Sequence, residues 1–253
     1  MVEVFFWPAL LGYGEAAFAY ASARTSRAAT WGVRVGWLAQ TALLAAQAAG
    51  ADAFPWSSWA GSLNLFVWFV VGAYLIWGCR PRFRLLGLAV MPLAAALFLV
   101  ARIGGGTDAG VKSGYGNVFL VLHVGLVLAA FAGFTLAAAL AALYLWEERR
   151  LKRRAADILR LRLPPLASLE QLTWRTIAVS LPLLTLGLAA GVIRQRERGG
   201  SLDALEVVTL VTWLAYSGFL ALRPTGRRAA YLALGGFVLV IVARLVLAGS
   251  HFT

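Results

Sequence analysis

Few side chains in this sequence could carry out metal or acid–base chemistry. Among 253 residues there are two histidines, His123 and His251, and one cysteine, Cys79. A single cysteine excludes a disulfide framework and any CxxC pair. Two imidazoles from two helices could bind a haem iron axially, and Arg244, seven residues before His251, could pair with an anionic propionate. The alternative is that His123 is a hydrogen-bonded packing residue and His251 a solvated tail residue.

The composition argues against a water-soluble protein. Hydrophobic residues make up 61% of the chain and charged residues 13%, and the mean hydropathy is +0.78. Soluble globular domains are nearer half apolar and a quarter charged, so the composition argues against a water-soluble single domain and excludes a disordered chain. Lys and Arg number 23 against 11 Asp and Glu, which gives a net charge of +12. In a soluble protein this excess would suggest a nucleic-acid partner.

Eight apolar stretches are long enough to cross a membrane as helices, for which about 20 residues are needed. They cover roughly residues 2–22, 31–49, 62–78, 85–102, 117–146, 174–193, 205–222 and 228–248. Their continuous runs of Leu, Ala and Val lack the alternation that is typical of strands. Because only helices or closed barrels satisfy their backbone in lipid, we predict an all-α, polytopic integral membrane bundle. It has about eight transmembrane helices in one domain over residues 1–253.

The loops between these stretches are asymmetric in charge. Most of the 23 Lys and Arg residues lie in the first, third, fifth and seventh connections, and the densest run falls within residues 149–162. Basic loops remain in the cytoplasm, so both termini are predicted to be external. The basic loops would then face anionic lipid head groups of the bilayer, and no nucleic-acid partner is needed to explain the charge. In this topology His123 and His251 both lie near the outer face.

Aromatic and amide side chains also gather toward the predicted outer face. Trp56 and Trp59 lie in the loop between the second and third apolar stretches. They could anchor the chain at the membrane interface or form a platform for a flat ligand. Gln40 and Gln47 are seven residues apart on one face of the second predicted helix. We expect both amides to hydrogen-bond to a neighbouring helix.

Several segments resemble a known protein family. They are residues 123–152, 163–172, 181–187, 209–214 and 249–251, with looser matches at 54–55 and 62–68. Through them the chain resembles the haem-handling cytochrome c assembly family of integral membrane proteins, and it is most similar to the HemX-like branch. In this family a histidine on each side of a tryptophan-rich outer loop is a haem ligand. The resemblance therefore implies haem as cofactor, ligand roles for His123 and His251, and a bacterial-type plasma (inner) membrane.

The chain departs from the family in that outer loop. The family carries a Trp-Asp-Pro-Lys-Glu core there, whereas residues 199–208 keep only the acidic positions, Asp203 and Glu206. The aromatic platform that would hold a porphyrin face is missing. Either haem binding is weak or absent, or Trp56 and Trp59 supply the surface. The simpler account of Asp203 and Glu206 is that they stabilise the N-terminus of the following helix.

These observations lead to one expected function and two alternatives. We expect a haem-handling protein related to cytochrome c assembly, which binds or presents haem at the outer face and works with cytochrome c assembly or haem-biosynthesis proteins. We expect it not to be an enzyme, because no nucleophile–base–acid set is visible in the sequence. One alternative is a regulatory scaffold of haem biosynthesis that acts through the basic arm at residues 147–162. The other is a small-solute transporter, which would need more polar groups at the membrane midplane.

Overall fold

The computed structural model describes residues 2–22, 26–50, 56, 58–77, 84–108, 118–153, 164–198 and 204–250. All regular structure in these ranges is helical. The helices are α1 (Val2–Ala21), α2 (Ser26–Ala49), α3 (Trp59–Trp77), α4 (Arg84–Ile103), α5 (Val118–Lys152), α6 (Leu166–Arg198), α7 (Ala204–Leu222) and α8 (Gly226–Ser250). The predicted all-helical class is confirmed, and each helix overlaps one predicted apolar stretch.

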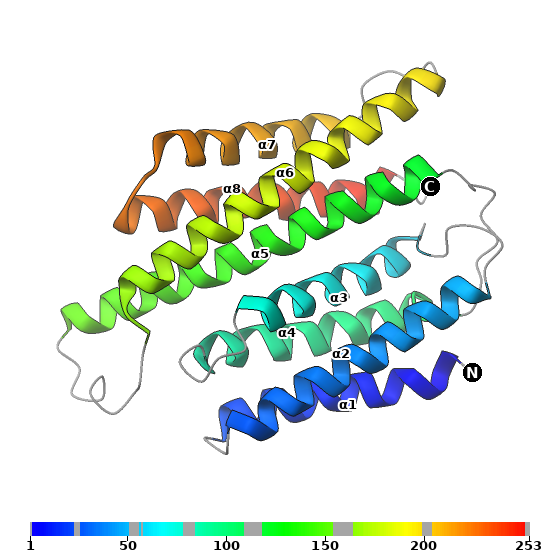
Figure 1. Cartoon of the computed structure of the whole chain (residues 1–253), viewed down its shortest axis with the longest axis horizontal. Helices are drawn as coiled ribbons and strands as arrows, with labels where there is room; N and C mark the ends of the chain where they lie inside the picture. Colours follow the sequence, from blue (N-terminus) through cyan, green and yellow to red (C-terminus); the bar gives the residue numbers. More distant parts are fainter. Residues whose placement is uncertain are drawn as a thin grey trace.

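The helices form two groups that follow the chain order. Helix α1 packs on α2 and α4, and α3 packs on α4, whereas α5 packs on α6 and α8, and α7 packs on α8. The two groups meet mainly where α3 lies against α5. Figure 1 shows α1–α4 side by side below α5–α8, with successive helices alternating in direction. The starts of α1, α3, α5 and α7 therefore share one end of the molecule, at the right of Figure 1. We refer to it as the predicted outer end, and to the opposite end as the predicted inner end.

Within the described residues, four helices are long and apolar enough to cross a membrane. They contain the segments Trp59–Ile76, Leu86–Ile103, Val121–Lys152 and Leu166–Ile193. These segments lie in α3, α4, α5 and α6, which support the membrane assignment. For α1, α2, α7 and α8 the membrane crossing stays a prediction.

Helices α5 and α6 extend furthest beyond the predicted apolar stretches. Helix α5 has 35 residues, which corresponds to about 52 Å and exceeds the ~30 Å of hydrocarbon in a bilayer. Helix α6 begins at Leu166, before the predicted apolar stretch that starts at residue 174. The carbonyl of Pro165 accepts hydrogen bonds from the N–H groups of Ser168 and Leu169, at 2.8 and 3.2 Å. The first two turns of α6 are rich in polar residues, so hydropathy does not reveal where the helix starts.

Small residues allow α1 and α2 to approach closely. A Cβ on Gly12 would lie 2.7 Å from the backbone nitrogen of Gly36, and one on Gly32 would lie 2.9 Å from the Gly12 carbonyl oxygen. Neither contact leaves room for a side chain at these positions. Close approach through small residues is a common way for helices to associate in membranes, where apolar side chains already have apolar surroundings.

The turn between α7 and α8 contains an unusual backbone conformation. Arg223 has φ = 45°, and its N–H donates to the Phe219 carbonyl at 3.1 Å as α7 ends. A left-handed residue is common after a helix but is usually Gly, and a side chain there costs about 1–2 kcal/mol. The N–H of Gly226 donates to Oε1 of Glu170 at 3.1 Å, which ties the turn to α6.

Candidate functional site

His123 lies in the second turn of α5 and faces α6. Its Nδ1 is 2.7 Å from the carbonyl oxygen of Gly187. A carbonyl oxygen can only accept, so Nδ1 carries the proton in this bond. In a neutral imidazole the lone pair is then on Nε2, which is the nitrogen that could bind a metal. A backbone partner on the other ring nitrogen is the usual way in which proteins orient a metal-binding histidine.

Two glycines of α6 make room for this imidazole. A Cβ on Gly191 would lie 2.8 Å from both Cε1 and Nδ1 of His123, and one on Gly187 would lie 2.8 Å from Cγ2 of Val127. A larger residue at either position would push α6 away from α5. The pair of glycines four residues apart is a signal for close helix contact that sequence reasoning missed.

The register of α5 against α8 brings the end of α8 toward His123. Glu148 of α5 and Arg227 of α8 form an ion pair at 3.1 Å near the predicted inner end. His123 is 25 residues before Glu148, close to seven helical turns, so both side chains share one face of α5. Along the axis of α5, His123 and Glu148 are about 37 Å apart, and along α8 the 23 residues from Arg227 to Ser250 cover about 35 Å. Helix α8 therefore ends within about one turn of the level of His123.

The remaining predicted histidine, arginine and acidic residues are only partly described. His251 follows the last residue of α8, and it lies outside the described residues, as does Asp203. Arg244 belongs to α8, but its side chain is outside the described part. Glu206 lies in the first turn of α7 and is half-buried. This is the position at which a carboxylate favours a helix N-terminus.

Trp56 and Trp59 lie at the predicted outer end of α3. The Nε1 of Trp56 donates to Oε1 of Gln47 at 3.2 Å, and the ring is half-buried. Trp59 is 39% exposed. One face of its ring packs on Gly104, where a Cβ would lie 2.5 Å from the ring atom Cζ2. Both rings are held at the same end of the molecule as the start of α5, and Trp59 retains an exposed surface.

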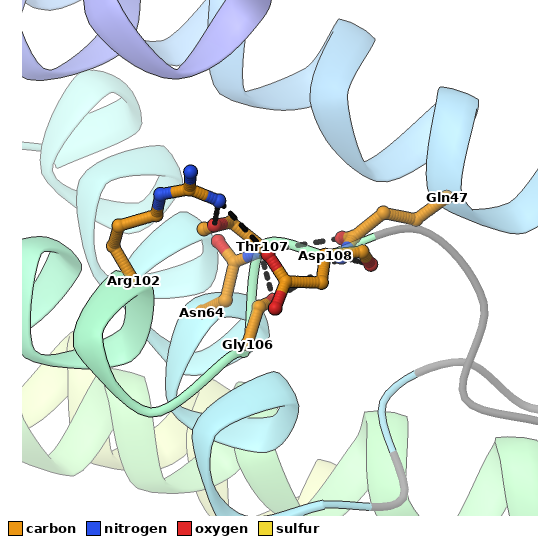
Figure 2. A network of polar contacts seen from close by, with 6 residues as sticks. All are labelled: Gln47, Asn64, Arg102, Gly106, Thr107 and Asp108. Carbon is orange, nitrogen blue, oxygen red and sulfur yellow. Dashed lines mark hydrogen bonds and ion pairs between the residues drawn. The ribbon is translucent and has the colours of Figure 1, made fainter. Parts of the chain in front are cut away.

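A buried polar network links α2 and α3 to the turn at residues 104–108. Figure 2 shows the amides of Gln47 and Asn64 pointing at the backbone of this turn. Gln47 Nε2 donates to the carbonyl oxygens of Gly106 and Asp108, at 3.2 and 2.9 Å. Asn64 Nδ2 donates to the Gly106 carbonyl at 3.1 Å. The network fixes the backbone of this turn against the helix bundle.

The same network reaches deeper through Gln40. Its Nε2 donates to Oδ1 of Asn64 at 2.8 Å, and its Oε1 accepts from the hydroxyl of Tyr13 at 2.5 Å. The prediction that Gln40 and Gln47 bond to a neighbouring helix is confirmed. Arg102 donates to Thr107 Oγ1 at 3.0 Å and to Asp108 Oδ1 at 2.9 Å. The contacts among these last three residues could not be predicted from the sequence, because the turn that joins them is not visible in hydropathy.

The described residues contain no group of three or more His, Cys, Asp or Glu side chains that could hold a metal ion. Within this part of the chain, an isolated metal ion would therefore lack a protein ligand set. An iron already held by four porphyrin nitrogens needs only one or two protein ligands.

Comparison with known proteins gives consistent matches. A family described as cytochrome C assembly protein matches residues 56–250. A cytochrome c biogenesis protein CcsA from Gloeothece citriformis is 28% identical, over 85% of this chain and 83% of its own length. A CcsA from a Picosynechococcus species is 28% identical, over 96% of this chain and 90% of its own. A CcsA from Guillardia theta is 28% identical, over 76% of this chain and 72% of its own length. No solved structure matches the chain.

Proposed function

The chain belongs to the cytochrome c assembly protein family, and from this premise we propose that it binds haem and presents it for cytochrome c assembly at the predicted outer end. The observation that supports this best is the contact between Nδ1 of His123 and the Gly187 carbonyl, at 2.7 Å. In a neutral imidazole this contact places the lone pair on Nε2, the nitrogen that would coordinate iron in this proposal. The narrower HemX-like assignment stays a prediction, because the three relatives described above are named as CcsA proteins.

The residues that would hold the haem come from three helices and the chain end. When bound, haem would supply an iron centre that histidine nitrogens can coordinate. His123 would provide one ligand and His251 the other, while the guanidinium of Arg244 would pair with a propionate. Trp56 and Trp59 would offer aromatic surface in place of the family's tryptophan-rich core.

In this proposal the chain binds and orients haem and makes no covalent bond itself. The partners would be other proteins of cytochrome c assembly, since the relatives are named as cytochrome c biogenesis proteins. We further propose a bacterial-type plasma membrane with both termini external, since basic residues concentrate in the connections at the predicted inner end. Asp203 and Glu206 would stabilise the start of α7 and contribute negative charge beside the site.

A regulatory scaffold of haem biosynthesis is the alternative. It is favoured by the extension of α5 to Lys152, which continues the helix past the apolar run into a basic segment. Arg150 stacks over the ring of Trp146, with 4.7 Å between its Cζ and the ring centroid. The contact surface would then be the arm at residues 147–162 rather than the predicted outer end.

A haem titration of the purified protein in detergent tests the proposal. We expect a shift of the Soret band with wild type, and loss of this shift in His123→Gln combined with His251→Ala. Glutamine is similar in size to histidine and removes the imidazole ligand, and unchanged thermal unfolding checks that the contact between α5 and α6 survives the change. An equal shift in the double variant, with unchanged thermal unfolding, would overturn the histidine site. Absence of any shift with wild type would favour the scaffold.

A further inference from the structure

A groove of about 440 Å³ opens between α6 and the turn that joins α7 to α8. Its polar lining includes Glu170, Gln171, Arg223 and Thr225, and its apolar lining includes Trp174 and Phe219. Nothing in the proposed haem site involves these residues, which lie at the predicted inner end. The groove therefore needs a separate explanation.

The lining changes from polar to apolar with depth. Arg223 and Thr225 belong to the turn between the helices, and Glu170 lies in the second turn of α6. Trp174 is one turn deeper than Glu170 and is 38% exposed. Tryptophan is the residue typical of the boundary between head groups and hydrocarbon. This gradient matches a membrane lipid, whose polar head lies at the level of the helix ends and whose chains lie deeper.

The groove carries one acidic and one basic side chain. Glu170 accepts the Gly226 N–H through Oε1 at 3.1 Å, so Oε2 can accept from a ligand. Arg223 and Thr225 are exposed at the rim and can donate to an anion. A guanidinium is a good partner for phosphate, and a carboxylate is a good partner for an ammonium group. A head group that carries both charges would satisfy both sides of the groove.

The backbone of Arg223 adds a second observation. This residue has φ = 45° at a position where Gly avoids the steric conflict. Strained residues are often found where the side chain has a function. A side chain that reaches into the groove gives a reason for Arg at this position.

We propose that this groove binds the head group of phosphatidylethanolamine. The phosphate would contact Arg223 and the Thr225 hydroxyl, and the ammonium would donate to Glu170. The acyl chains would lie along Trp174 and Phe219. Phosphatidylglycerol lacks the ammonium group, and the choline of phosphatidylcholine has no N–H to donate. The groove is therefore selective for phosphatidylethanolamine over both.

Native mass spectrometry and thermal unfolding in detergent test this proposal with the full chain. Each of the three lipids is added at equal concentration. We expect phosphatidylethanolamine to be retained at least severalfold more than the other two lipids, and to give the largest rise in unfolding temperature. Glu170→Gln should remove this preference, because the amide keeps an oxygen for the Gly226 N–H but loses the charge that attracts the ammonium. Arg228→Gln is the matched control, since Arg228 is exposed and does not line the groove.

Arg223→Gly separates binding from folding. Gly relieves the left-handed backbone, so this variant should unfold at a higher temperature without lipid and should lose the lipid-dependent rise. Equal retention of phosphatidylethanolamine and phosphatidylglycerol by wild type would overturn the proposal. So would an unchanged preference in Glu170→Gln and Arg223→Gly.

Discussion

His123 shows how one contact prepares a side chain for chemistry. Its Nδ1 is held by the Gly187 carbonyl, 64 residues further along the chain. The sequence indicated that His123 could be a ligand, but not which of its ring nitrogens carries the proton. That depends on the register of α5 against α6, which hydropathy does not encode. The glycine pair at 187 and 191 was the available signal, because it marks where two helices come closest.

Gly191→Ala tests the space that the imidazole requires. The added Cβ would lie 2.8 Å from the ring, so the ring or α6 must move. We expect a loss of about 1–3 kcal/mol in the free energy of unfolding and about 10–100-fold weaker haem binding. Gly218→Ala is the control, because a Cβ there meets nothing within 4 Å. Thermal unfolding and haem titration measure both effects, and equal behaviour of the two variants would show that the ring is not confined.

At the scale of the elements, the existence of the helices could be predicted but their ends and neighbours could not. The presence of each helix could be predicted from an apolar run, because about 20 apolar residues are needed to cross a bilayer. The apolar run of α6 does not mark the start of the helix at Leu166, because the first turns of α6 precede that run and follow Pro164 and Pro165 directly. The partners of Gln40 and Gln47 also needed the structure, because Asn64 and the turn at residues 104–108 come from other parts of the chain.

Asn64→Leu tests how strongly the polar network holds these elements together. The change removes one of the two acceptors of Gln40 Nε2, whose bond to the Asn64 carbonyl at 3.0 Å remains, and one donor to the Gly106 carbonyl. Each buried hydrogen bond contributes about 0.5–1.5 kcal/mol, and we expect a destabilisation of about 1–3 kcal/mol. Asp108→Asn should cost less than about 1 kcal/mol, since Asp108 is 61% exposed in its ion pair with Arg102. Chemical unfolding in detergent compares the two, and a larger effect of Asp108→Asn would contradict this ranking.

At the scale of the whole molecule, the alternating helix directions place the two ends of the bundle in different environments. The connections at the predicted inner end carry most of the basic residues. The sequence predicts this orientation from charge alone. The division into two helix groups that meet through α3 and α5 could not be predicted, because apolar surfaces facing lipid and facing protein have similar compositions.

Cysteine labelling tests the orientation. In a Cys79→Ser background, Asp108→Cys lies in the turn at the predicted outer end and Thr225→Cys lies in the turn at the predicted inner end, and both native residues are exposed. A membrane-impermeant thiol reagent should label position 108 in intact cells, and position 225 only after permeabilisation. The reverse pattern would invert the orientation and place the haem site on the opposite side of the membrane.

The central claim is that His123 and His251 bind haem together. Electron paramagnetic resonance of the purified protein loaded with ferric haem tests it most directly, because two imidazole ligands give a low-spin iron. We predict a low-spin signal for wild type and a high-spin signal for His123→Gln, in which one imidazole remains. A high-spin signal from wild type, or a low-spin signal that persists in the variant, would contradict the claim.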